Sequence, residues 1–86
     1  MKIRDGYMLR EVAGTAVVVP VGVDNSFNGM LKLNGTGKFL WEHLTEETDK
    51  EALVSALLAE YEITADIAAR DVDAFLAALA KMNILE

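Results

Sequence analysis

The segment from Met30 to Trp41 changes from the pattern of a strand to the pattern of a helix with almost no loop between them. Residues 30–33 alternate between apolar and polar side chains, as a half-buried strand does. The next residue, Asn34, has a side-chain oxygen that can accept a hydrogen bond from an unpaired N–H group in the first turn of a helix. Gly37 lacks a Cβ, which would let this helix lie close against the strand. The segment therefore predicts a strand that leads directly into a packed helix.

The rest of the chain predicts two strands before this junction and two helices after it. We expect strands over residues 7–12, 15–19 and 27–33, with a mobile connection over 21–26, and a first helix over 35–44. Two more helices should follow. Strands followed by helices are an α+β order, and a winged-helix-like domain with a three-stranded antiparallel sheet is the simplest architecture. At 86 residues the chain should form a single domain, 1–86.

Local signals mark the ends of the later helices. Thr48 and Glu51 have the spacing of a capping box and should open the second helix. Either Thr64 or Asp66 should cap the third helix. Asn83 suits the left-handed position that ends a helix, after which the last apolar residues should fold back onto the core. The expected core-facing stripes are Leu53, Val54, Leu57, Leu58 and Tyr61 in the second helix, and Ala68, Val72, Phe75, Leu76, Leu79 and Met82 in the third.

Composition argues against several functions. The net charge is −6 and the eight Lys and Arg residues are scattered, whereas a nucleic-acid reader needs a basic stripe. The chain has no Cys and a single histidine, His43, which we interpret as a surface or boundary residue of a helix. No nucleotide-binding, metalloprotease or hydrolase motif is present, and no pair of carboxylates suggests acid–base catalysis. We therefore expect no enzymatic activity, no cofactor and no metal. No apolar run is long enough to span a bilayer, so we expect a cytoplasmic protein.

Two motifs resemble one known family. L-N-G-T-G-K-F-L-W, over residues 33–41, resembles the strand-to-helix junction of the PqqD-like proteins, which are also called RiPP recognition elements. D-V-D-A-F-L-A-A-L-A-K-M-N-I-L, over residues 71–85, resembles the last helix and apolar tail of that family. Residues 45–48 read T-E-E-T where founding members carry a Cys-Asp-Gly turn, and Asn83 stands where a glycine is usual. The resemblance therefore implies a divergent member rather than the quinone-pathway protein itself.

The predicted third strand is the candidate binding element. It would lie at an edge of the sheet and it contains no proline. Lys32 is the one charged residue in it that would discourage pairing with another strand. Such an edge can bind a peptide as an additional strand, with the third helix as the other wall of a groove. The sequence does not decide which flank of that helix faces the strand. We prefer the flank with Phe75 and Met82, since these side chains could form an apolar pocket. The predicted site comprises Phe27, Asn28, Gly29, Met30, Leu31, Lys32, Leu33, Asp71, Ala74, Phe75, Ala78 and Met82.

The resemblance implies a binding partner for this edge and a second partner. The first is the leader segment of a ribosomally made precursor peptide, and the second is a modifying enzyme, for example of the radical S-adenosylmethionine class. Two alternatives stay open at this point. One is a winged-helix DNA-binding regulator, and the other is a small structural subunit that forms a homodimer through the third strand. In a further alternative, the N-terminal segment covers the strand edge.

Overall fold

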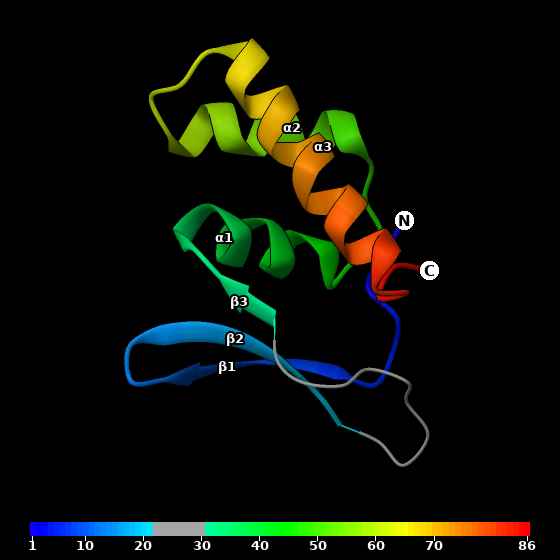
Figure 1. Ribbon diagram of the computed structural model, residues 1–86. Coiled ribbons are helices and arrows are strands. Elements are labelled where there is room, and N and C mark those ends of the chain that lie inside the picture. Colours follow the sequence, from blue (N-terminus) through cyan, green and yellow to red (C-terminus); the bar gives the residue numbers. More distant parts are fainter. Residues whose placement is uncertain (22–30) are drawn as a thin grey trace.

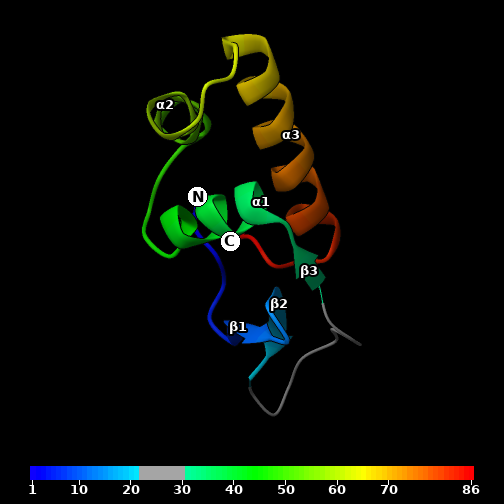
Figure 2. The same cartoon turned by 90° about the vertical axis from the view of Figure 1, so that its left-hand side faces the viewer.

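The computed structural model describes residues 1–21 and 31–86, and it has the expected α+β order (Figure 1). The strands are β1 (Tyr7–Val12), β2 (Thr15–Pro20) and β3 (Leu31–Leu33), and the helices are α1 (Gly35–Leu44), α2 (Lys50–Glu60) and α3 (Ala65–Lys81). The helices lie on one side of the sheet, with α1 between the sheet and the pair formed by α2 and α3 (Figures 1 and 2). The predicted three-stranded antiparallel sheet followed by three helices is confirmed. None of the helices in the described ranges is both long and apolar enough to cross a membrane.

The sheet has the strand order β1-β2-β3, and both neighbouring pairs are antiparallel. A tight turn at Ala13 and Gly14 joins β1 to β2, and both residues have positive φ (52° and 81°). The central strand β2 supplies buried side chains, and Pro20 stands at its end, where a missing N–H group costs least. Of the strand predicted over 27–33, the structure places 31–33 in β3. The predicted connection over 21–26 lies outside the described residues except for Val21.

Side-chain caps fix where the helices begin. Thr64 Oγ1 accepts a 3.2 Å hydrogen bond from the N–H of Ile67, so the predicted cap of α3 is confirmed for Thr64. The predicted start of α2 is wrong by one residue. Asp49 is the cap, and its Oδ1 accepts a 2.8 Å bond from the N–H of Ala52. The backbone N–H of Thr48 donates instead to the carbonyl oxygen of Met1, so Thr48 belongs to the connection that holds the N-terminal segment.

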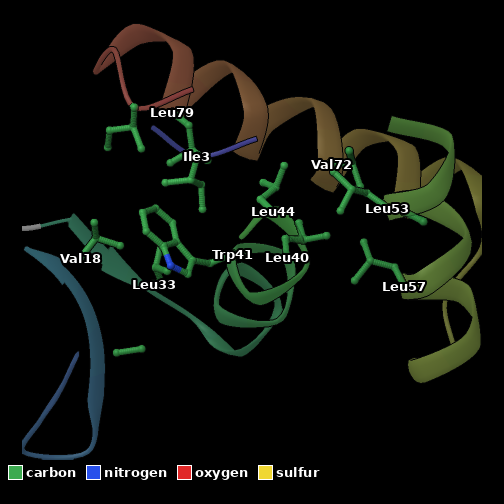
Figure 3. Close-up of a cluster of buried hydrophobic side chains, with 13 residues drawn as sticks. Ile3, Val18, Leu33, Leu40, Trp41, Leu44, Leu53, Leu57, Val72 and Leu79 are labelled. Carbon is green, nitrogen blue, oxygen red and sulfur yellow. The ribbon is translucent and has the colours of Figure 1, made fainter. Parts of the chain in front are cut away.

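The core lies where the helices meet the inner face of the sheet (Figure 3). Trp41 is 3% exposed and lies among side chains from β2, β3 and the N-terminal segment. The fully buried positions of α2 and α3 are Leu53, Leu57, Ala68, Val72 and Leu79. One residue of the predicted α2 stripe departs from it, because Leu58 is 39% exposed. Helices α1 and α3 cover only part of the predicted α2 stripe, and Leu58 lies at the margin of the covered part.

The C-terminal tail closes the core as predicted. Asn83 has φ of 60° and ends α3, and the next N–H, that of Ile84, donates to the carbonyl oxygen of Leu79 at 2.9 Å. Ile84 is completely buried. Leu85 forms an antiparallel bridge with Ile3, so the first and last segments of the chain hold each other, and the two termini lie near each other in both views (Figures 1 and 2).

Candidate functional site

A groove of about 340 Å³ lies between the edge of the sheet and helix α3. Strand β3 forms one wall, the first turns of α1 form the floor at one end, and α3 forms the opposite wall. The residues that line it are Leu31, Lys32 and Leu33 from β3, Asn34, Thr36, Gly37 and Leu40 from the junction and α1, and Asp71, Ala74, Phe75 and Ala78 from α3.

The wall formed by β3 offers both backbone and side-chain groups. In the described part of the sheet, β3 is the last strand in the order, so only one of its edges pairs with another strand. Leu31 and Leu33 pack toward the core, whereas the alternate residue Lys32 is exposed. An edge strand of this kind carries N–H and C=O groups that can pair with an added strand.

The core positions of α3 determine which of its flanks faces β3. Val72 and Leu79 are completely buried, and this fixes the rotation of the helix about its axis. Asp71, Ala74, Phe75 and Ala78 then lie along the groove. Asp73, on the opposite flank, forms a 2.8 Å ion pair with Lys50 of α2. The flank carrying Asp71 and Phe75 therefore faces the strand. The two alanines on this flank have short side chains, which leave space in the groove beside the helix.

The floor of the groove is built by the strand-to-helix junction. Asn34 Oδ1 accepts a 2.7 Å hydrogen bond from the N–H of Gly37, which starts α1 directly after β3. Gly37 is buried, and a Cβ placed on it would lie 3.4 Å from both Leu33 Cβ and Phe75 Cε1. The close approach predicted for this glycine is therefore present, and it involves α3 as well as the strand.

The charges at the groove lie on opposite walls. Lys32 brings a positive charge to the β3 side, and Asp71 brings a negative charge to the α3 side; both side chains are exposed. Within residues 1–21 and 31–86, no three His, Asp or Glu side chains come together in a way that could hold a metal ion. The groove thus combines apolar and uncharged polar lining residues with two isolated charges, an arrangement that suits an extended peptide better than a small anionic ligand.

The structure brings together seven of the residues predicted from the sequence. Leu31, Lys32, Leu33, Asp71, Ala74, Phe75 and Ala78 all line the groove. Met82 does not line it and is partly buried against the core. Phe27, Asn28, Gly29 and Met30 lie outside the described residues.

Four lining residues were not predicted as part of the site: Asn34, Thr36, Gly37 and Leu40. The signal for them was present in the sequence, because a helix that starts directly after an edge strand must place its first turn at the end of that strand. Asn34 and Gly37 were recognised only for their structural roles.

The N-terminal segment lies against the ends of α1 and α3, away from the edge of β3 that it would have to cover to close the groove. Ile3 pairs with Leu85, and its N–H donates to the carbonyl oxygen of Leu44 at 3.0 Å. The N–H of Arg4 donates to the carbonyl oxygen of Ile84 at 2.7 Å. These bonds hold the segment against the ends of α1 and α3, so this segment does not occupy the edge of β3.

Comparison with known proteins places this fold in a family. No curated protein matches the chain significantly. A solved structure described as "TbiB1 in Complex with the TbiA(beta) Leader Peptide" is similar, with a TM-score of 0.80 and 29% sequence identity over 100% of this chain and 95% of that one. The model of the family described as coenzyme PQQ synthesis protein D (PqqD) matches residues 7–85. That match covers nearly the whole chain, and the chain therefore belongs to the PqqD family.

Proposed function

We propose that this chain is a non-catalytic domain that captures the leader segment of a ribosomally synthesised precursor peptide by strand addition at β3. The observation that carries the proposal is the groove itself: the edge of β3 that pairs with no other described strand faces a partly apolar wall of α3 with short side chains at Ala74 and Ala78. An edge strand next to a helix groove offers main-chain pairing and side-chain pockets together. The structural similarity to a protein solved with a leader peptide supports the same function.

The two walls would contribute differently to binding. Main-chain hydrogen bonds to the edge of β3 would set the register of the peptide but would distinguish little between sequences. Alternate side chains of an added strand point to opposite faces, so every second peptide side chain would enter the groove toward Phe75 and Leu33. Sequence preference would therefore come from the groove. The full proposed site comprises Phe27, Asn28, Gly29, Met30, Leu31, Lys32, Leu33, Asp71, Ala74, Phe75, Ala78 and Met82.

A domain of this kind would act together with a second protein. Holding the leader beside a modifying enzyme raises the local concentration of the precursor at the active site, which makes the modification step effectively intramolecular. The enzyme, for example one of the radical S-adenosylmethionine class, would supply both the chemistry and any cofactor. We place this domain, spanning residues 1–86, in the cytoplasm, where precursor peptides are made.

The DNA-binding alternative fits α3 poorly. A recognition helix needs positive charge along its exposed face, and α3 carries only Arg70 and Lys81 among three acidic residues. Two of those, Asp71 and Asp73, lie near the middle of the helix, where phosphate groups would be repelled. Peptide binding is the function that the groove supports best.

A substitution in the groove tests the proposal. Ala78 is exposed and lines the groove, so Ala78→Arg should fill the groove without disturbing the core. The matched control is Ala77→Arg, since Ala77 is exposed one residue away and does not line the groove. The probe is a peptide selected on the wild-type protein from a displayed library of short random peptides. We expect Ala78→Arg to weaken its binding about tenfold or more, roughly 1.4 kcal/mol, and Ala77→Arg to leave binding almost unchanged.

Circular dichroism of both variants should match the wild type. Equal binding by Ala78→Arg and the wild type would overturn the proposed site, as would a library that yields no peptide sensitive to Ala78→Arg. An equal loss in both arginine variants would indicate a non-specific charge effect and would also overturn the proposed site.

A further inference from the structure

The outer face of the sheet, which is turned away from the helices, carries positive charge (Figures 1 and 2). The charged residues of the described strands are Arg10, Glu11 and Lys32. Glu11 lies on the helix side, where its carboxylate accepts a 2.7 Å hydrogen bond from Lys38 of α1. Arg10 and Lys32 alternate with core-facing residues, so they lie on the outer face, and both are exposed. The described strands thus bring two positive charges and no negative charge to this face, although the whole chain has a net charge of −6.

The two cations stand in one row across the sheet. Val17 of β2 pairs with Arg10 of β1 on one side and with Lys32 of β3 on the other. Two strand spacings separate the backbones of Arg10 and Lys32, a distance of about 10 Å. Since β3 is the last strand in the described sheet, the row ends at Lys32. An added strand would continue the row with a residue of its own directly beside Lys32.

The charge of Lys32 is not neutralised by the described part of the chain. Lys38 and Lys50 form ion pairs with carboxylates at 2.7 and 2.8 Å, whereas no ion pair joins Lys32 or Arg10 to any residue within 1–21 and 31–86. Directly opposed residues of neighbouring strands have Cβ atoms about 4.5–5.5 Å apart, which is close enough for opposite charges to attract. Lys32 can therefore interact with a charged residue of an added strand.

We propose that Lys32 selects an acidic residue, Asp or Glu, at the outward-facing position beside it in the bound peptide. This inference rests on the proposed function and adds to it the charge of the ligand and the residue that recognises this charge. Successive side chains of a strand point to opposite faces, so the acidic residue would stay outside the groove while its two neighbours enter it. Arg10 would contribute less, because its distance is close to the screening length of salt at physiological strength.

Library selection on three proteins tests the inference. Short random peptides are selected on the wild type, on Lys32→Glu and on Arg10→Glu, and only peptides that Ala78→Arg weakens are kept. Arg10→Glu is the matched control, because both reversals change the net charge equally at exposed positions of the same face. The wild type should enrich Asp or Glu at one position. Lys32→Glu should shift that position to Lys or Arg, and Arg10→Glu should keep the acidic residue.

A double-mutant cycle then measures the contact directly. A wild-type-selected peptide and its variant with the corresponding amide, Asn for Asp or Gln for Glu, are titrated onto the wild type, Lys32→Gln and Arg10→Gln. The acidic residue should improve binding about twofold to fivefold on the wild type and on Arg10→Gln, and hardly at all on Lys32→Gln. If Lys32→Glu does not fold, the milder Lys32→Gln still decides the question, with folding checked by circular dichroism.

The cycle also distinguishes recognition from a purely structural role of Lys32. A lysine in an edge strand discourages pairing between copies of a protein. That role predicts that Lys32→Gln changes self-association, and it predicts no difference between acidic and amide peptides. An acidic residue that improves binding equally on the wild type and on Lys32→Gln would therefore overturn the inference.

The outcomes separate this inference from the proposed function. If no selected peptide depends on Ala78, the proposed function fails and the inference fails with it. If groove-dependent peptides are obtained but show no acidic position, only the role of Lys32 fails. An acidic preference that Arg10→Glu and Lys32→Glu abolish equally would indicate a general charge effect and would also overturn the inference.

Discussion

Asn34 Oδ1 accepts a 2.7 Å hydrogen bond from the backbone N–H of Gly37, and this bond joins the last strand to the first helix. The carbonyl oxygen of Asn34 also accepts a 2.9 Å bond from the N–H of Lys38. Helix α1 can therefore begin one residue after the cap, with no intervening loop. The position of the groove floor relative to the β3 wall follows from these two bonds.

Replacing Asn34 tests the contribution of this cap. Asn34→Ala removes the acceptor for the Gly37 N–H and should lower the free energy of unfolding by about 1 kcal/mol. Asn34→Asp keeps an acceptor at the same position and should stay close to the wild type. Urea denaturation monitored by circular dichroism measures both variants, and equal stability of Asn34→Ala and the wild type would show that the cap contributes nothing.

Gly37 should tolerate a methyl group and not a larger side chain. Gly37→Leu must push against Leu33, Asn34 and Phe75, and overpacking of this kind costs about 1–3 kcal/mol. In Gly37→Ala the gain in helix propensity, about 1 kcal/mol, offsets the tight contact with Asn34. Thermal melting should therefore rank Gly37→Leu well below Gly37→Ala. A Gly37→Leu protein as stable as the wild type would contradict the packing at this position.

The ion pair between Glu11 and Lys38 should be visible in a titration. The hydrogen bond and charge of Lys38, at 2.7 Å, lower the pKa of the Glu11 carboxyl, and Glu11 raises the pKa of Lys38. Because the folded-state pKa of Glu11 is depressed, the pair stabilises the fold above the unfolded-state pKa, and this contribution is lost as the pH falls through the folded-state pKa. Carboxyl-carbon NMR should show that Lys38→Met raises the Glu11 pKa toward its ordinary value.

Both side chains of this pair are substantially exposed, so salt screens their attraction. Added salt should therefore also raise the Glu11 pKa, but by less than Lys38→Met does. Lys50→Met is the matched control, since it breaks a different surface ion pair, with Asp73. It should leave the Glu11 titration unchanged. An unchanged Glu11 pKa in Lys38→Met would contradict the assigned cause.

Duplex DNA should not bind this protein measurably. The net charge of −6 repels phosphate groups, and this repulsion is strongest at low salt. Fluorescence anisotropy with a labelled duplex at about 50 mM salt provides the measurement. Micromolar or tighter binding with a steep salt dependence would restore the DNA-binding alternative.

Much of the fold could be predicted because its signals are local. The cap at Asn34, the positive φ expected of Asn83 and the order of strands and helices rest on signals between neighbouring residues in the sequence, and the structure confirms these three features. The start of α2 was missed because Thr48 and Asp49 are both good caps. The choice between them depends on Met1, which is far away in the sequence and bonds to Thr48.

The site was less predictable because it depends on how distant elements pack. The rotation of α3 that turns Asp71 toward β3 follows from the burial of Val72 and Leu79 against other elements. The sequence of the helix alone does not say where those elements lie. The same holds for Leu58, whose exposure depends on which part of α2 is covered. Gly37 could be recognised as a close-packing residue, but its proximity to Phe75 appears only in the folded structure.

The most direct test of the central claim is chemical-shift mapping of the isotope-labelled protein with a groove-dependent peptide from the library selection. Strand addition at β3 predicts the largest amide shifts at Leu31, Lys32 and Leu33, with a second group at Asp71, Ala74, Phe75 and Ala78 of α3. The amides of α2 should change little. Shifts concentrated on β1 or α2, with β3 unchanged, would contradict peptide binding in this groove.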